Sequence, residues 1–402
     1  MSLVDTRNTG LGGRDAQTRL SVDMPSAPVR VVIRNRPSEV SADNLALEKD
    51  GKTVTVRQGR TDSGGTVKHE TLSFTCDAVL ANASQEKVFD DVARPICEDV
   101  LEGFNGTIMC YGQTGAGKSF TMVGDGQDYH LRGVAPRALG QIFREVNNRP
   151  EYQYTVRFSC LEIYNENLFD LLATLPEYGP RSELSLLGEG RGGVPVKGLT
   201  SAEVGSEEEA LRLLFEAEAN RAVAEHALNQ ASSRSHVLYL LTVERRSRVA
   251  SGGAVQSARL TLVDLAGSER LKKSSSASYV PDATMPPHVR QQQQQQQLEA
   301  MSINKSLAFL EQVVMALGAR GGRSHVPHRS SKLTAVLRDA LGGNCRTTLV
   351  ANIWGESRHI EETVSTLKFA LRMRNVTTSA VLNQSVELTP AVGCPDPARP
   401  RR

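Results

Sequence analysis

The sequence predicts an α/β fold, in which a central mixed β-sheet is flanked by helices. Short apolar runs typical of buried strands alternate along the chain with segments whose apolar residues follow a helical period. One such run, residues 106–111, is followed by a glycine-rich segment and then by a helical start at Phe120. We therefore expect one large domain whose sheet has a glycine-rich loop at the end of a strand.

The N-terminal half begins with residues 1–28, which are polar and glycine-rich and predict a disordered leader. The predicted elements that follow are a strand at 29–33, a helix at 85–104 with Ser84 as N-cap and a kink at Pro95, a strand at 106–111, and a strand at 154–160 that changes to helical spacing over 161–172.

The C-terminal half continues the alternation. The predicted elements are a helix from the capping box at Ser206 to about Glu225, strands at 237–245 and 259–265, a helix at 303–317 that stops at Gly318, a strand at 347–353 and a helix at 361–374.

Two segments do not fit a packed core. Residues 272–297 are rich in Ser and Pro and end in seven glutamines, so we expect a solvated loop insertion. The residues after Val376 lack heptads and become proline-rich towards 391–402, which predicts a flexible tail and no dimerising coiled coil. The folded domain is therefore expected to span 29–376 and to be monomeric.

Composition excludes several classes of protein. With 39% hydrophobic and 23% charged residues among 402, the chain can bury a large core, and no apolar run is long enough to cross a membrane. The 47 basic and 45 acidic residues nearly balance, which gives no overall sign of a nucleic-acid or membrane partner. Six scattered cysteines without C-x-x-C spacing favour a reducing cytoplasm.

The segment Gly112–Ser119 reads Gly-Gln-Thr-Gly-Ala-Gly-Lys-Ser and matches the pattern G-x-x-x-x-G-K-[ST]. Glycines allow successive backbone N–H groups to turn towards phosphates, Lys118 supplies a positive charge, and the Ser119 hydroxyl can bind Mg²⁺. A glycine-rich surface turn is the alternative, but the strand and helix on either side favour a phosphate site.

Two further polar segments point to the same chemistry. Asp264 ends a buried strand and is followed by Leu-Ala-Gly267, so its carboxylate can act on a Mg²⁺-bound water; a turn-capping role is the alternative. Residues 229–236, Asn-Gln-Ala-Ser-Ser-Arg-Ser-His, are too polar for a core and suit a loop that senses a terminal phosphate. For His236 alone, ordinary polar packing is the favoured interpretation.

Together these segments resemble the P-loop, switch I (229–236) and switch II (264–269) of the kinesin motor domain. The resemblance extends to Arg-Asn-Arg-Pro at 34–37 and over about residues 28–385, and it implies a P-loop NTPase kinesin fold with about eight strands and helices on both faces. The segments 167–176 and 376–378 are most similar to the kinesin-9 group, which is associated with cilia and flagella.

The resemblance implies a site for ATP and Mg²⁺, and the absence of an N-K-x-D segment independently argues against guanine recognition. The implied nucleotide contacts are Arg34, Arg36, Pro37, Gly112, Gln113, Thr114, Gly115, Ala116, Gly117, Lys118, Ser119 and Phe120; the Mg²⁺ ligands are Ser119, Ser233 and, through water, Asp264; the hydrolytic residues are Ser232, Ser233, Arg234, Gly267 and Glu269. Arg234 and Glu269 are expected to pair when both switches close.

The implied partner is the microtubule, an acidic lattice. Between Arg320 and Arg338 the chain carries five basic residues and no acidic one, which net charge conceals. A solvated face is the ordinary interpretation of such a run, but this one overlaps the family's track-binding loop. The implied contacts are Arg329, Lys332 and Arg338, with Lys272 and Lys273 in the insertion, where a tolerated excursion is the alternative.

The resulting hypothesis is a microtubule-stimulated ATPase motor, plus-end directed and acting in the cytoplasm on the cytoskeleton, in a cilium or flagellum. Residues 377–390 would form its neck linker, with Asn383 resembling the family's latch asparagine. The alternative is a kinesin-like module that holds microtubules with little ATP turnover. A nucleic-acid helicase is a distant third, because aromatic residues make up only 5% of the chain.

Overall fold

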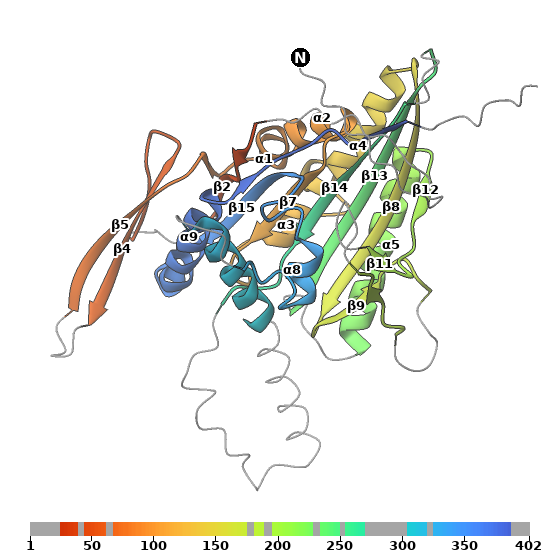
Figure 1. Cartoon of the computed structure of the whole chain (residues 1–402). Coiled ribbons are helices and arrows are strands. Elements are labelled where there is room, and N and C mark those ends of the chain that lie inside the picture. The colour runs from red at the N-terminus through yellow and green to blue at the C-terminus, as the bar shows by residue number, and fades with distance from the viewer. Residues whose placement is uncertain are drawn as a thin grey trace, which may run out of the picture.

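The computed structural model describes residues 25–38, 44–61, 67–174, 181–188, 195–227, 234–249, 254–269, 304–319 and 325–386. Its centre is a twisted sheet whose main path has eight strands, with helices on both faces (Figure 1). In spatial order the strands are β12 (Ala202–Val204), β8 (Tyr152–Tyr164), β13 (His236–Ser247), β14 (Ala254–Asp264), β7 (Gly106–Tyr111), β15 (Arg346–Trp354), β2 (Arg30–Arg36) and β6 (Ala78–Ala81). The predicted α/β class and mixed sheet are confirmed.

The strands from β14 to β6 run parallel, whereas β12, β8, β13 and β14 pair antiparallel. Two short strands extend the sheet, since β9 (Asn167–Asp170) pairs with β8 and β17 (Gln384–Val386) pairs with β14. Smaller sheets join β3 (Leu45–Leu47), β4 (Thr53–Thr61) and β5 (Val67–Thr75); β10 (Ser185–Leu186) and β11 (Val196–Lys197); and β1 (Ala27–Pro28) and β16 (Thr377–Thr378). The hairpin of β4 and β5 projects from one end of the molecule (Figure 1).

Alternate residues of each strand serve two separate cores, because successive side chains of a strand point to opposite faces. In β7, Ile108 and Cys110 pack with α1 (Gln85–Val92), α2 (Arg94–Leu101), α4 (Val134–Asn148) and α5 (Glu207–Ala227). Met109 and Tyr111 face α8 (Lys332–Val336), α9 (Ile360–Arg374) and the helical residues 304–318. Burial of both faces explains why these strands read as continuous apolar runs.

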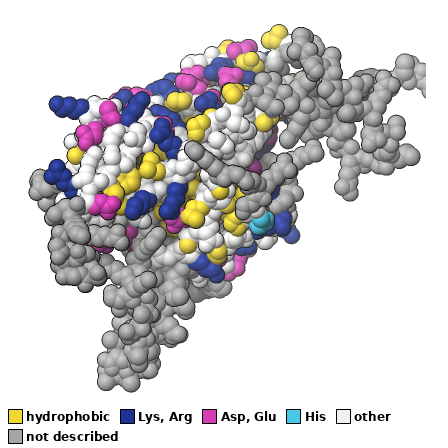
Figure 2. Space-filling model, turned by 60° about the vertical axis from the view of Figure 1, so that its left-hand side comes forward, with side chains coloured by type: hydrophobic (Ala, Val, Ile, Leu, Met, Phe, Trp, Pro, Cys, Tyr) yellow, Lys and Arg dark blue, Asp and Glu magenta, His cyan; other side chains and the backbone are white. Residues whose placement is uncertain are grey.

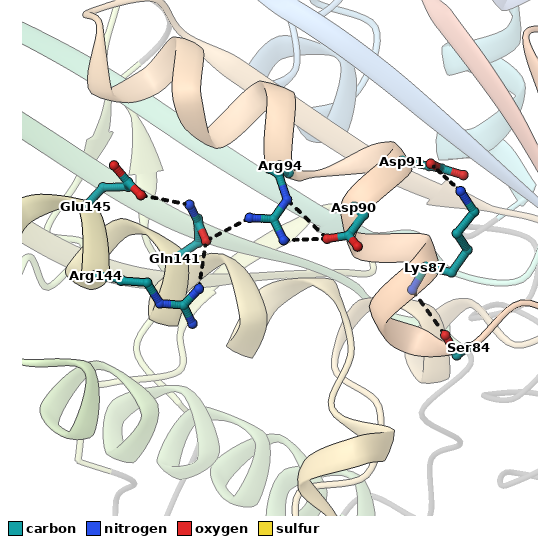
Figure 3. Close-up of polar contacts among 8 residues, drawn as sticks. All are labelled: Ser84, Lys87, Asp90, Asp91, Arg94, Gln141, Arg144 and Glu145. Atoms are coloured by element: carbon teal, nitrogen blue, oxygen red, sulfur yellow. Dashed lines mark hydrogen bonds and ion pairs between the residues drawn. The ribbon is translucent and has the colours of Figure 1, made fainter. Parts of the chain in front are cut away.

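Polar contacts connect the helices on the first face (Figure 3). Ser84 accepts a hydrogen bond from the Lys87 amide and caps α1, as predicted. Arg94 of α2 reaches Asp90 of α1 at 2.5 Å and donates to Gln141 of α4 at 3.2 Å. Instead of the predicted continuous helix with a kink, two helices form here. Pro95 lies in the first turn of α2, where its missing N–H costs nothing.

The predicted helix over 161–172 is wrong. Residues 161–164 continue β8, and the chain then reverses into β9 through Asn165 and Glu166, both of which have positive φ. The register places Leu161 opposite Leu238 of β13, so β8 stays paired with β13 beyond residue 160, where the spacing of apolar residues predicted a helix. Tertiary pairing has overridden a helical period here.

The chain ends also differ from the expectation. Ala27 and Pro28, predicted to belong to the disordered leader, form β1 and pair with β16 in the predicted linker. Residues 1–24, the tail 391–402 and the predicted insertion 272–297 lie outside the described residues. Among the described helices, none is long and apolar enough to cross a membrane.

Candidate functional site

The P-loop, switch II and residues 34–37, which the sequence predicts to bind the nucleotide, lie at one edge of the sheet. β14, β7, β15 and β2 are parallel neighbours, so their carboxyl ends lie together, and the loops that leave them form the rim of an open α/β site. β7 leads into the P-loop and then into α3 (Lys118–Met122), while β14 ends at Asp264. Figure 1 shows α3 beside β7 and β14 at the centre of the molecule.

Glycine is required within the P-loop for conformational and steric reasons. Gly115 and Gly117 have φ of 81° and 94°, in the left-handed region that other residues rarely adopt. A Cβ on Gly112 would collide with the backbone oxygen of Asn352 in β15. The loop therefore packs closely against the neighbouring strand.

Lys118 is almost completely buried at the start of α3, with 6% of its surface exposed. Its Nζ donates a hydrogen bond to the Gln113 carbonyl oxygen at 3.0 Å, on the other side of the same loop. Burial lowers the pKa of the Lys118 ammonium, and the nearby carboxylates of Asp264 and Glu269 partly oppose this. The lysine is thus held inside the phosphate loop, where a bound anion would favour its charged form.

Ser119 and Asp264, which the sequence predicts to bind Mg²⁺ together, lie in direct contact. The Ser119 Oγ donates to Asp264 Oδ2 at 2.5 Å, although the two residues are 145 positions apart. Asp264 is 2% exposed, and its Oδ1 is buried without a hydrogen-bond partner in the described part of the chain. A hydroxyl and a carboxylate with a free oxygen suit Mg²⁺, which binds hard oxygen ligands and keeps waters and phosphates in its shell. The residues present therefore fit the metal.

A buried charged cluster behind Asp264 was not found from the sequence. Arg221 of α5 is 4% exposed and lies 3.9 Å from Asp264 Oδ2 and 3.7 Å from Glu218. Glu218 accepts a hydrogen bond from the Tyr239 hydroxyl at 2.5 Å, and burial raises the pKa of the Glu218 carboxyl. In the sequence, Arg221 and Glu218 show only the three-residue spacing of an ordinary helical ion pair, and the fold alone places them beside Asp264.

Switch II contacts the P-loop through Glu269. Both carboxylate oxygens of Glu269 accept hydrogen bonds from Thr114, one from its amide at 2.8 Å and one from its hydroxyl at 2.5 Å. A Cβ on Gly267 would collide with the side chains of Thr114 and Glu269, which would have to shift to admit a larger residue. The expected partner, Arg234, is the first described residue of switch I, whereas Ser232 and Ser233 lie outside the described residues. The Arg234–Glu269 pair of closed switches stays a prediction.

His236 has a more specific environment than ordinary packing. Its Nδ1 accepts a hydrogen bond from the Ala266 amide of switch II at 3.0 Å, and its Nε2 lies 2.9 Å from the Ser306 hydroxyl in the helical residues 304–318. Complete burial, with the positive charges of Lys118 and Arg221, lowers the pKa of His236 to about 3. The neutral imidazole therefore bridges switch II and a helix on the second face of the sheet.

Among the residues expected to contact the nucleobase, some are exposed and one is buried. Phe120 is 44% exposed, and Pro37 and Arg36 are also exposed, so all three are accessible to a ligand. Arg34 is only 8% exposed and lies beneath the Phe120 ring, 5.4 Å from its centroid. It donates to Gln85 at 3.0 Å and to Thr121 at 2.8 Å, which indicates that Arg34 supports Phe120 from below.

β15 supplies residues that the sequence analysis missed. Asn352 is 1% exposed, and its Nδ2 donates to Thr121 Oγ1 at 2.8 Å and to the Gly117 carbonyl at 3.3 Å. Gln113 of the P-loop lies 2.9 Å from the His359 ring just after this strand. A polar residue inside an apolar strand is the signal that could have identified Asn352.

The predicted track-binding residues come together only in part. Lys332 is the first residue of α8, and its amide donates to Glu166 in the β8–β9 turn at 2.8 Å. Arg329 is exposed just before this helix and Arg338 is half-buried just after it, whereas Lys272 and Lys273 lie outside the described residues. On the side that carries β4 and β5, basic and acidic side chains are interspersed (Figure 2), in keeping with the balanced net charge.

The segment that follows α9 lies along the sheet. Asn383 donates to the Gly103 carbonyl from its amide at 3.0 Å and from its side chain at 3.2 Å, and its Oδ1 accepts from Asn344 at 2.9 Å. Asn383 also lines a cavity of about 350 Å³ between the sheet and α8, which is separate from the P-loop. The structure thus places the proposed latch asparagine at a junction between β7 and the loop before β15.

Comparison with known proteins agrees with this geometry. A family model of the kinesin motor domain matches residues 34–376. Kinesin-like protein KIF9 of Mus musculus is 44% identical over 362 residues, which cover 89% of this chain and 44% of that protein. Kinesin-like protein KLP1 of Chlamydomonas reinhardtii is 46% identical over 364 residues, which cover 90% of this chain and 44% of that protein.

A solved structure of a fast kinesin is also similar, with 37% identity and a TM-score of 0.74, over 91% of this chain and 96% of that one. The kinesin motor fold and the predicted similarity to the kinesin-9 group are therefore confirmed. The chain spans less than half the length of the two curated relatives.

Proposed function

The chain belongs to the kinesin motor domain family, and from this premise we propose that it hydrolyses ATP in response to microtubule binding and converts the cycle into movement. Kinesin motor domains in general bind nucleotide and microtubules and are ATPases. The proposal includes ATP turnover by this chain, its plus-end direction and its action in a cilium or flagellum.

The observation that carries the proposal is the meeting of Ser119 with Asp264 and of Thr114 with Glu269. Each pair joins the P-loop to switch II at 2.5 Å between side-chain oxygens. The two segments are distant in sequence and have no local reason to be adjacent. A ligand phosphate at the P-loop would therefore lie within reach of switch II, which is what a nucleotide-driven switch requires.

The residues divide into binding and hydrolytic groups. The P-loop amides and Lys118 would hold the phosphates, and Phe120, Pro37 and Arg36 would contact the base. Ser119 and Ser233, with Asp264 through water, would hold Mg²⁺, which neutralises phosphate charge when it is bound.

Hydrolysis would depend on the two switches. The amide of Gly267 and the hydroxyl of Ser232 would position the γ-phosphate and the attacking water, with Ser233 beside them. Arg234 and Glu269 would pair as the switches close, and Glu269 would first have to leave Thr114. Release of this carboxylate from the P-loop links phosphate binding to switch closure.

The partner would be the microtubule, contacted through Arg329, Lys332 and Arg338 and, from the insertion, Lys272 and Lys273. The stretch from Arg320 to Arg338 carries five basic residues and no acidic one, which suits an acidic lattice. The position of residues 377–390 after the motor favours plus-end movement, and the kinesin-9 resemblance favours the axoneme of a cilium or flagellum. No nucleic-acid or membrane partner and no dimerisation of the head itself are proposed.

Steady-state ATPase measurements with and without microtubules test the proposal. We expect stimulation by microtubules in the wild type and loss of nucleotide binding in Lys118→Ala, because Lys118 is the buried cation of the phosphate loop. Arg212→Ala on the exposed face of α5 is the matched control and should behave as wild type. Microtubule binding without stimulated hydrolysis would instead favour the alternative, a structural microtubule-binding module.

A further inference from the structure

Trp354, the only tryptophan of the chain, lies at the nucleotide edge of the sheet. It is the last residue of β15 and is half-buried. The parallel register of β15 and β2 places it directly opposite Arg36, which is the last residue of β2. None of the motifs that predict the phosphate site includes this residue.

The indole ring lies in a stack of three groups. The His359 ring stacks on it with a centroid separation of 4.0 Å and an interplanar angle of 26°, and the Arg36 guanidinium carbon lies 4.3 Å from the indole centroid. Burial and the neighbouring Arg358 lower the pKa of His359, so its ring is neutral near pH 7 and adds no repulsion to the arginine. We call Trp354, His359 and Arg36 the Trp354 stack.

The Trp354 stack is bonded to the first half of the P-loop at two points. Arg36 Nη1 donates to the Gly115 carbonyl oxygen, and the Gln113 side-chain amide lies 2.9 Å from His359 Nδ1. The indole also fills the space beside Gly115, where a Cβ would lie 2.9 Å from its Cζ3 atom. The backbone carbonyl of Gln113 accepts the hydrogen bond from Lys118 Nζ. Gln113 is therefore bonded both to the Trp354 stack and to the lysine of the P-loop.

We infer that Trp354 is a positioning residue for the nucleotide, which acts through Arg36, Gln113 and Gly115 and sets nucleotide affinity. This inference rests on the proposed function. A loop and a guanidinium that are already fixed need less ordering when a ligand binds, and the saved entropy appears as affinity. The stack makes no described contact with Ser119, Asp264 or Glu269, so Trp354 should leave the chemical step unchanged.

The test compares Trp354→Leu, which removes the aromatic face, with Trp354→Phe, which keeps one. The dissociation constant of ADP carrying an N-methylanthraniloyl label is measured by fluorescence polarisation. We expect Leu to raise it about two- to thirtyfold, the range for loss of a cation–π contact, and Phe to stay within about twofold of wild type. Equal affinity of the Leu variant and wild type would overturn the inference.

Tyr152→Leu is the matched control. It removes a similar contact, in which the Arg245 guanidinium carbon lies 4.5 Å from the Tyr152 ring, at the opposite end of β8 and β13 from the P-loop. We expect its ADP affinity to equal that of wild type. An increase in the dissociation constant as large as that of Trp354→Leu would show a general loss of packing and would contradict a positioning role.

Microtubule-stimulated ATPase assays separate affinity from chemistry. We expect Trp354→Leu to raise KM for ATP by the same factor and to leave kcat within about twofold, whereas a loss confined to kcat would contradict the inference. If Trp354→Leu does not fold, His359→Leu removes the neighbouring ring and the bond to Gln113 and should raise KM in the same way. If wild-type protein binds labelled ADP but shows no ATPase activity, the proposed function alone is refuted. The comparison of ADP affinities would still test the role of Trp354.

Discussion

Acidification is expected to destabilise the protein through His236. This residue is completely buried as a neutral imidazole between Ala266 and Ser306, with its pKa lowered to about 3. In the unfolded chain the same side chain titrates near its ordinary value of 6.5. Below pH 6.5 the unfolded state therefore binds a proton at His236 that the folded state does not bind, and unfolding becomes more favourable as the pH falls.

The size of the effect follows from the two pKa values. Each pH unit below 6.5 costs about 1.4 kcal/mol of unfolding free energy until the folded-state pKa is approached. Between pH 7.5 and pH 5 the loss from this one residue is about 2 kcal/mol, and any folded-state pKa below about 4 gives the same figure.

Urea unfolding at pH 7.5 and pH 5 measures this loss in wild type and in His236→Gln, which keeps hydrogen-bonding capacity without titrating. The variant should lose about 2 kcal/mol less than wild type over this interval. His130→Gln, at an exposed histidine, is the control and should follow wild type. An identical pH dependence in wild type and His236→Gln would refute a buried neutral histidine.

Three further predictions concern hydrolysis, the track and the C-terminal segment. Glu269→Ala should retain labelled-ATP binding but lose at least about a hundredfold in microtubule-stimulated kcat, the lower end of general acid–base contributions, and near-normal turnover would contradict the assignment. Arg329→Glu should raise the microtubule Kd by about two- to fivefold in cosedimentation and weaken its salt dependence, whereas Arg212→Glu on α5 should not; unchanged binding across a salt series would count against the α8 surface. Asn383→Ala removes the side-chain bonds to Gly103 and Asn344, keeps the backbone bond to Gly103, and should destabilise the docked segment by about 1–2 kcal/mol, seen as faster amide exchange at 381–386; unchanged exchange would show that the asparagine side chain does not hold the segment.

Local chemistry made the conformation of the P-loop predictable. A glycine-rich loop between a strand and a helix has few alternative structures, because left-handed residues such as Gly115 and Gly117 require glycine. The same holds for Asp264, since an acidic residue at the end of an apolar run stands out in the sequence. For residues that act by touching distant segments the signal is weaker: Asn352 is marked only as a polar residue in an apolar strand, and His359 carries no such local signal.

The prediction for residues 161–172 failed for a related reason. Their apolar positions are compatible with a helix over a short window, and only the partner strand β13 decides that residues 161–164 remain extended. Asn165 and Glu166, with positive φ, then allow the reversal into β9. Short apolar segments are ambiguous until their neighbours in the sheet are known.

The sequence by itself determined the α/β class and the family, and it predicted the residues of the phosphate loop and switches, because these depend on motifs within a few residues of each other. Only the tertiary structure showed that Glu269 is bonded to Thr114, that Arg34 is buried beneath Phe120, and that the Trp354 indole lies against Gly115 of the P-loop. Contacts between residues tens to hundreds of positions apart are set by strand order and register, and those depend on packing of the whole sheet rather than on local pattern.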